Sequence, residues 1–239
     1  MEKERFEEQA RRAKEFYDKA ALAERIENVT NSSEELKIMS EKIKKYNNIE
    51  NSIFLHLGAG TGRFVNELDK LFKPKGSVAI DIADGYFEKL KNEFKLNSSI
   101  EIKHESFFNT DFHKFVGEQL FVFMNWTVLS EVGSKEGLEY LLTEINKFDK
   151  KKIIIGDLPF QEEYMDAILD YASKFRIELD NLGVLEFIWG KDNKHLLYLP
   201  NKNQLKEICE KQSFIPQEFI DYHAQNNQKR YIFELVNTL

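Results

Sequence analysis

The sequence lacks most of what would cross-link a chain or fix it in a membrane. It has a single cysteine, Cys209, so no disulfide bond can form within the chain, and a metal site built from cysteine thiolates is excluded. No apolar stretch reaches the roughly 18 residues of a membrane-spanning helix. Residues 1–8 are mostly charged, unlike a secretion signal. We therefore expect a soluble protein of the reducing cytoplasm, without membrane contact.

Positive charge is also scarce. Lysine and arginine total 34 against 41 aspartates and glutamates, a net charge of -7, so no overall positive field would attract phosphates. Nucleic acid is therefore an unlikely partner. The five histidines show no metal-ligand spacing such as His-x-x-x-His, and no metal site is expected. A composition of 42% hydrophobic and 31% charged residues suits one α/β domain with a sizeable core.

The most informative stretch is a strand, a glycine turn and a helix near residue 60. The uncharged run Ile53–Leu57 predicts a buried parallel strand, and the glycines at 58, 60 and 62 follow it before a helical pattern begins. Glycine has no Cβ, so a ligand can lie against this backbone, and the N–H groups at a helix start favour an acidic or polar ligand group. The next strand ends at Asp81, whose carboxylate suits a ribose diol.

The spacing of the glycines helps to separate two cofactor classes. A dinucleotide-binding motif, G-x-G-x-x-G, requires glycine at position 63, where this chain has Arg63. The G-x-G-x-G found here, between an apolar strand and a helix and followed by an acidic strand end, resembles the first motif of the class I S-adenosylmethionine-dependent methyltransferases. From this motif alone, a strand–helix turn without a ligand and a nicotinamide-binding fold with an altered motif stay open.

The rest of the chain predicts the fold. Five strands alternate with helices as far as Pro159, which indicates a doubly wound, Rossmann-like parallel sheet with right-handed crossovers. Two further strands, 214–222 and 229–236, are joined too closely for a crossover helix and must run antiparallel. A seven-stranded α/β sheet whose last strand is antiparallel resembles the methyltransferase fold and is hard to reconcile with a nicotinamide domain.

Two segments lie outside this alternation. The first is residues 1–46, which we expect to form N-terminal helices. The second lies within residues 47–239, the expected methyltransferase domain. The apolar face of a helix over residues 1–27 predicts packing on the domain or on a second subunit, and the resemblance implies a lid over the cofactor, with Arg25 near its carboxylate. Residues 160–199, a helix followed by a hairpin, are inserted after the fifth strand. They are a candidate substrate-binding insertion or, equally, a dimerisation hairpin in a homodimer.

The resemblance also implies particular cofactor contacts. Ser106 stands at the third strand end, where the family usually has an adenine-binding aspartate, and Asn125 at the fourth, near the amino-acid end of the cofactor. His56 replaces the acidic residue that commonly precedes the first glycine by two positions. The implied cofactor-binding residues are Tyr17, Gly58, Ala59, Gly60, Thr61, Gly62, Asp81, Ile82, Ser106, Phe107, Asn125 and Trp126.

The resemblance implies a function as well. The cofactor would be S-adenosyl-L-methionine, and the reaction would be methyl transfer to an oxygen or nitrogen of a small-molecule acceptor. An RNA or protein acceptor, or a catalytically silent cofactor-binding module, remain alternatives. Four side chains near the expected pocket mouth are candidates for a catalytic base, and the sequence does not select among them: Asp157, Glu131, His195 and His223.

Overall fold

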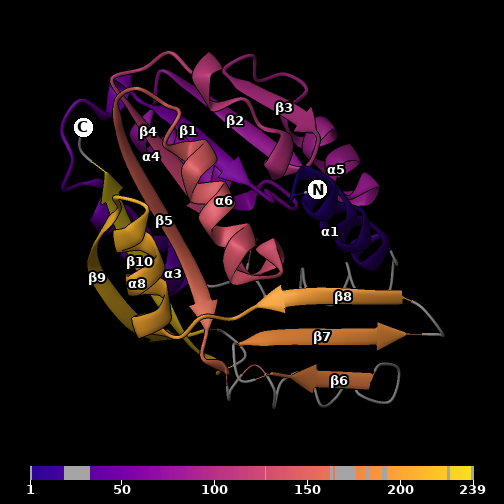
Figure 1. Cartoon of the computed structure of the whole chain (residues 1–239). Coiled ribbons are helices and arrows are strands. Elements are labelled where there is room, and N and C mark those ends of the chain that lie inside the picture. Colours follow the sequence, from indigo (N-terminus) through magenta and orange to yellow (C-terminus); the bar gives the residue numbers. More distant parts are fainter. Residues whose placement is uncertain are drawn as a thin grey trace.

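The central element of the structure, a computed structural model, is a seven-stranded sheet (Figure 1). The structure describes residues 2–18, 33–126, 128–161, 164, 176–180, 183–189, 193–224 and 227–237. The strands lie in the order β3-β2-β1-β4-β5-β10-β9. Their bounds are β1 (Ile53–Leu57), β2 (Gly76–Asp81), β3 (Ile100–His104), β4 (Gln119–Met124), β5 (Lys151–Pro159), β9 (Ile215–His223) and β10 (Lys229–Asn237).

The direction of the last strand confirms the prediction for the end of the chain. β10 runs antiparallel to both of its neighbours, with Ile232 opposite Asp157 on β5 and Ile220 on β9, whereas the strands from β1 to β5 pair in parallel. β9 ends at His223 and β10 begins at Lys229, and a connection that short permits no parallel crossover. The start of β10 therefore lies at the same sheet edge as the carboxyl ends of the parallel strands.

Helices cover both faces of the sheet. Their bounds are α1 (Glu2–Tyr17), α3 (Ser33–Ile43), α4 (Arg63–Phe72), α5 (Asp84–Phe94), α6 (Lys135–Ile145) and α8 (Lys202–Lys211). Side chains alternate along each strand. Leu55 therefore belongs to a core cluster with residues of α6, α8 and α1, and Phe54 belongs to a second cluster with residues of α3 and α4. The described residues also include short 3-10 turns, η1 (Ile49–Asn51), η2 (Phe107–Asn109), η3 (Phe112–Lys114) and η4 (Val128–Val132).

The predicted hairpin after the fifth strand is present and belongs to a second sheet. β7 (Val184–Trp189) and β8 (Asn193–Tyr198) pair antiparallel, and β6 (Arg176–Leu179) adds a third strand that the sequence patterns did not reveal. This small sheet lies near the end of the central sheet at which β5 finishes (Figure 1). Most of the helix expected from Gln161 to Phe175 lies outside the described residues.

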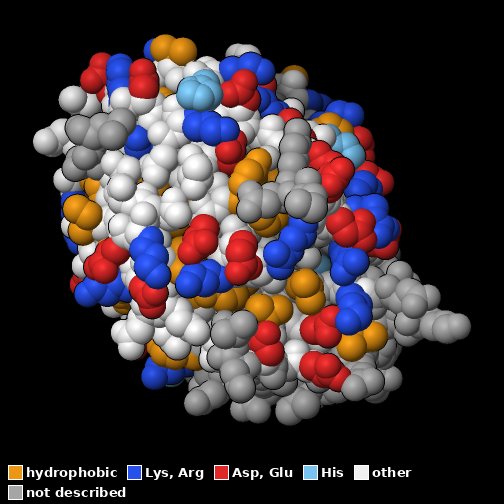
Figure 2. Space-filling model, in the orientation of Figure 1, with side chains coloured by type: hydrophobic (Ala, Val, Ile, Leu, Met, Phe, Trp, Pro, Cys, Tyr) orange, Lys and Arg blue, Asp and Glu red, His pale blue; other side chains and the backbone are white. Residues whose placement is uncertain are grey.

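The N-terminal helix α1 connects the small sheet to the main domain. It contacts β8, η4 and η2, and its Phe6 ring stacks on Phe108 at 5.1 Å and on Tyr140 at 4.6 Å. The remainder of the helix expected over residues 1–27, including Arg25, lies outside the described residues. None of the helices described here has the length and apolar composition of a transmembrane segment. On the face drawn in Figure 2, acidic and basic side chains are interspersed.

Candidate functional site

The glycine turn leaves one stretch of backbone uncovered. All three glycines have positive φ, +59° at Gly58, +58° at Gly60 and +83° at Gly62, a region that favours glycine. A Cβ at Gly58 would lie 2.7 Å from Val128 Cγ2, and one at Gly62 would lie 2.5 Å from Phe94 Cε2. Packing therefore requires glycine at both positions. A Cβ at Gly60 would meet nothing within 4 Å. Gly60 therefore offers open space beside its backbone, as a ligand cradle requires.

The carboxylate of Asp81 lies against this open backbone. Its Oδ2 accepts a hydrogen bond from Gly60 N at 2.8 Å, and its Oδ1 accepts one from Ala83 N at 2.9 Å. Burial raises the pKa of Asp81 to about 6, against the opposing effect of these backbone donors. A carboxylate has about four lone-pair sites, so it can accept ribose hydroxyls in addition to the two N–H groups. The structure thus brings the predicted turn and the predicted carboxylate together.

At the tip of β3, the predicted contacts already have partners within the protein. Ser106 Oγ accepts from Phe108 N at 3.2 Å and caps η2, and the Phe107 ring packs on Phe108 with 4.6 Å between centroids. Ile82 O lies 3.0 Å from His104 Nε2. Thr61 lines an open surface depression with residues of α5, and none of the lining residues belongs to a strand tip.

At the tip of β4, the two predicted residues differ in their environment. The Oδ1 atom of Asn125 is buried and has no hydrogen-bond partner within the described part of the chain. Trp126 adopts φ +55°, and its backbone N–H donates to Asp157 Oδ1. The centroid of its ring lies 4.3 Å from the guanidinium carbon of Arg230. Trp126 is therefore packed against protein groups, whereas the Asn125 oxygen is available to accept from a ligand.

The first base candidate, Asp157, lies in a buried ion pair. Arg230 Nε and Nη2 both lie 2.5 Å from Asp157 Oδ2, and the Tyr222 hydroxyl donates to the same oxygen at 2.9 Å. Burial and the Asp157 charge raise the pKa of the neighbouring Glu35 well above its ordinary value. Because its oxygens accept from Arg230 Nε, the Tyr222 hydroxyl and the backbone N–H of Trp126, Asp157 holds neighbouring groups in place and is not free to act as a base. His223 is exposed on β9.

The other two base candidates meet under α1. Glu131 on η4 accepts from the Tyr17 hydroxyl through Oε1, and its Oε2 lies 3.0 Å from His195 Nε2 on β8. Burial, followed by the Glu131 charge, raises the pKa of Tyr17 well above its ordinary value. Gln9 Nε2 also donates to the Glu131 carbonyl at 3.2 Å and to the Leu196 carbonyl at 2.7 Å. We refer to Tyr17, Glu131 and His195 as the α1 cluster.

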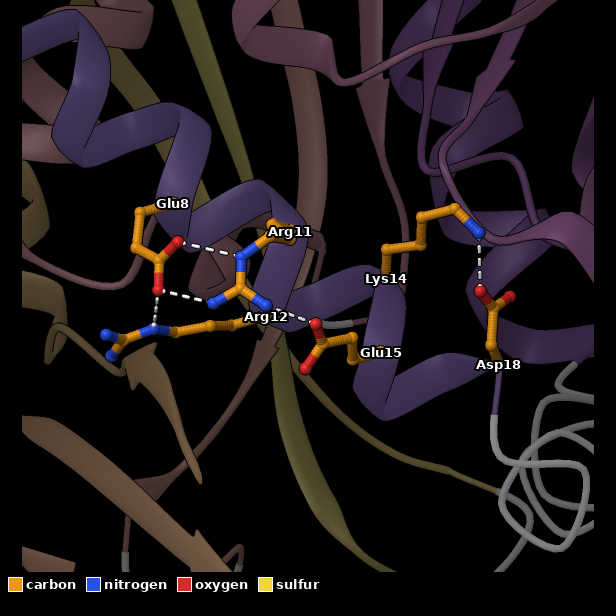
Figure 3. A network of polar contacts seen from close by, with 6 residues as sticks. All are labelled: Glu8, Arg11, Arg12, Lys14, Glu15 and Asp18. Carbon is orange, nitrogen blue, oxygen red and sulfur yellow. Dashed lines mark hydrogen bonds and ion pairs between the residues drawn. The ribbon is translucent and has the colours of Figure 1, made fainter. Parts of the chain in front are cut away.

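The far end of α1 is joined to the start of α5. Lys14 Nζ lies 2.6 Å from Asp18 Oδ2 and 2.7 Å from an Asp84 carboxylate oxygen, while Asp84 N donates to Asp18 Oδ1 at 2.8 Å. Figure 3 shows the Lys14–Asp18 contact and, further along the helix, Glu8 between Arg11 and Arg12. Exposed pairs of this kind contribute little stability each. These contacts place the end of α1 close to Asp81, because Asp84 follows Asp81 by three residues.

His56 stands at the position where an acidic residue was expected. Its ring is buried and stacks on Phe123 with 4.8 Å between centroids, and burial lowers its pKa to about 3. The imidazole is therefore neutral at physiological pH. Its Nε2 has no hydrogen-bond partner among the residues that the structure describes.

Comparisons with known proteins agree with this architecture. No family model matches the chain, and no curated protein matches its sequence. Among solved structures, an S-adenosylmethionine-dependent methyltransferase from Clostridium acetobutylicum is 11% identical with a TM-score of 0.64, over 92% of this chain and 98% of that one. Magnesium protoporphyrin IX methyltransferase from Synechocystis, with bound S-adenosylhomocysteine, is 8% identical with a TM-score of 0.66, over 96% and 100%.

A third similar structure contains both a product cofactor and an acceptor. It is the 1,6-didemethyltoxoflavin-N1-methyltransferase of Burkholderia thailandensis, with 1,6-didemethyltoxoflavin and S-adenosylhomocysteine bound. It is 10% identical, with a TM-score of 0.65 over 98% of this chain and 91% of that one. The chain therefore has the fold of the class I S-adenosylmethionine-dependent methyltransferases, as its glycine motif and reversed last strand predicted.

Proposed function

We propose that the protein is an S-adenosylmethionine-dependent methyltransferase that acts on an oxygen or nitrogen of a small molecule. The observation that carries this proposal is the open backbone at Gly60, hydrogen-bonded to Asp81 at the carboxyl edge of a methyltransferase sheet. Gly58 and Gly62 have packing reasons to be glycine, but Gly60 faces open space. In this fold a ligand at that edge would lie on the Gly60 backbone, with its ribose at Asp81.

The residues present fit the proposed cofactor. Its ammonium group has three N–H donors, and Asn125 Oδ1 and His56 Nε2 are buried atoms without partners in the described structure. The amide oxygen can accept from the ammonium group, and so can Nε2 in the tautomer with hydrogen on Nδ1. Asp81 would hold the ribose, and Ser106 and Phe107 would border the adenine. When bound, the cofactor supplies an electrophilic methyl group on a positively charged sulfur. The protein's contribution is to orient the two reactants and to exclude water.

A small-molecule acceptor is favoured over RNA. The net charge is -7, and the face in Figure 2 mixes acidic with basic side chains. The α1 helix contacts the small sheet of residues 176–198, so both elements flank the carboxyl edge of the central sheet. We assign residues 160–199 to the acceptor wall and residues 1–46 to the covering segment of a domain that spans residues 47–239.

The test is calorimetry with S-adenosylmethionine and with S-adenosylhomocysteine. Gly60→Asp should abolish binding, because bulk and negative charge would enter the cradle, while the far-ultraviolet dichroism stays unchanged. Gly85→Asp is the matched control, since a Cβ at Gly85 also meets nothing within 4 Å and that residue lies on α5. If the wild-type protein binds neither compound, or if Gly60→Asp binds both normally, the proposal fails.

The acceptor class needs a second measurement. Transfer of a radiolabelled methyl group to a metabolite panel should occur, and a gel shift with transfer RNA at low salt should not, because phosphate-driven binding is strongest at low salt. A retarded RNA band together with methyl transfer to that RNA would replace the small-molecule assignment. Tight cofactor binding without transfer to any acceptor would indicate a silent binding module.

A further inference from the structure

The α1 cluster contains a buried nitrogen without a partner. His195 is fully buried, and its Nε2 lies 3.0 Å from Glu131 Oε2. The Nε2–Oε2 contact is within ion-pair distance but is not a hydrogen bond, and neither ring nitrogen has a hydrogen-bond partner in the described regions of the chain. In a neutral imidazole one nitrogen carries the proton and the other a lone pair. If Nε2–H is directed at the carboxylate, the Nδ1 lone pair is free to accept a proton.

The surroundings of His195 are mainly aromatic. The Phe16 ring stacks on the imidazole with 4.7 Å between centroids, and the Phe187 ring lies 6.3 Å away across the hairpin. Native structures rarely leave a buried polar atom unpaired, and such atoms are often found at sites of function. The arrangement resembles other base–carboxylate pairs in that a buried carboxylate orients the imidazole and stabilises its protonated form.

The charged and titratable groups around His195 come from several elements. Glu131 approaches from η4 and Tyr17 from α1, and Tyr17 interacts electrostatically with Tyr164 and with Tyr86 on α5. Tyr86 belongs to the helix that follows Asp81, so the cluster borders the proposed cofactor site. On the hairpin itself, Lys194 pairs with Glu186 at 2.6 Å, and strand alternation directs that pair away from His195.

Building on the proposed function, we infer that His195, oriented by Glu131, is the base that accepts the proton of the methyl acceptor. The acceptor would be a neutral, flat and largely apolar molecule with a weakly acidic O–H or ring N–H. Its oxygen or nitrogen forms the bond to the methyl carbon, and the carbon–sulfur bond breaks with its electron pair on sulfur. The acceptor proton passes to His195 Nδ1 and later to water, while Glu131 stabilises the imidazolium.

A first test needs neither the cofactor nor an acceptor. Nitrogen-15 NMR of the five histidines, with the His195 signals assigned by their loss in His195→Gln, reports which ring nitrogen carries the proton. In the singly protonated ring we expect the hydrogen on Nε2 and a bare Nδ1. A doubly protonated ring, or one with hydrogen on Nδ1, would leave no lone pair on Nδ1 to take the proton of the acceptor, and would overturn the assignment.

The second test measures methyl transfer to a panel of phenols and ring N–H heterocycles. His195→Gln keeps an N–H donor toward Glu131 but has no basic nitrogen, so kcat should fall by about 10²–10⁴-fold while the Kd for S-adenosylmethionine is unchanged. The deficit should shrink as pH approaches the pKa of the acceptor, which then ionises without help. Glu131→Gln should show a smaller loss, and exposed His223→Asn should behave as wild type.

The outcomes distinguish the two proposals. A merely structural His195 would give a lower melting temperature and the same fractional loss of kcat at every pH, which would overturn the base role. Cofactor binding by the wild-type protein without transfer to any phenol or ring N–H compound would overturn the acceptor class. A wild-type protein that does not bind S-adenosylmethionine would refute the proposed function itself, whatever the tautomer of His195.

Discussion

Replacing Arg230 with methionine should destabilise the protein strongly, because the change leaves a carboxylate buried without its cation. Arg230 is 1% exposed and Asp157 is 0% exposed, and two guanidinium nitrogens lie 2.5 Å from one oxygen of Asp157. Methionine is apolar and long enough to keep most of the packing. The Tyr222 hydroxyl and the Trp126 N–H would remain as donors to Asp157, but both are uncharged.

The size of the effect follows from the burial of the pair. Removing one partner of a buried ion pair typically costs about 3–5 kcal/mol in the free energy of unfolding. For a chain of this size each kcal/mol lowers the melting temperature by about 2–4 °C, so a fall on the order of 10 °C is expected. The deficit should be smaller at pH 5 than at pH 8, because a buried carboxylate without its cation takes up a proton more readily.

Urea denaturation followed by tryptophan fluorescence measures this change. Arg230→Met/Asp157→Leu removes both charges and should recover most of the loss, because apolar replacements of a whole pair are often nearly neutral. Arg5→Met is the exposed control: Arg5 is 61% exposed and lies 3.9 Å from Glu136, so its change should stay within about 0.5 kcal/mol. A loss below about 1 kcal/mol for Arg230→Met, or a double variant no more stable than the single one, would refute the reasoning.

Three further predictions address single positions. Asp81→Ala should weaken S-adenosylmethionine binding at least tenfold in calorimetry while changing the melting temperature little, because the burial cost of this carboxylate offsets its backbone bonds; equal binding by both proteins would exclude the ribose role. The pKa of Glu35 is raised on folding, so wild-type stability should decrease as pH rises from 4.5 toward the folded pKa, and Glu35→Gln should flatten that part of a urea pH series. Gly62→Ala should cost about 2 kcal/mol or more, because its Cβ would overlap Phe94, whereas Gly60→Ala should cost roughly 1–2 kcal/mol of backbone strain alone; equal urea midpoints would contradict the packing difference.

Local patterns were sufficient to predict the sheet and its glycine turn. The uncharged run before Gly58 and the strand end at Asp81 predicted two adjacent parallel strands, because a buried strand and a glycine turn each depend on neighbouring residues only. The reversal of β10 followed from the short connection after Tyr222.

Contacts between distant segments were not predictable in this way. Tyr17 and Glu131 are 114 residues apart, and no periodicity indicates that α1 would place them together. Asp157 was a base candidate because it ends a strand, but its role depends on Arg230, which only the sheet order brings beside it. An arginine near the start of a strand that continues with three apolar residues was the available signal. β6 was missed because Arg176–Leu179 is too short to show a clear alternation.

The attachment of α1 at its middle and just past its carboxyl end has a consequence for exchange of ligands. Through Gln9 the helix holds the hairpin and η4, and through Asp18 it holds the start of α5. The α1 helix thus contacts elements on both the acceptor side and the nucleoside side of the proposed site. Loosening at either side should be transmitted to the other, so hydrogen exchange in α1 should slow when either compound binds, and each compound should then raise the affinity for the other by the same factor.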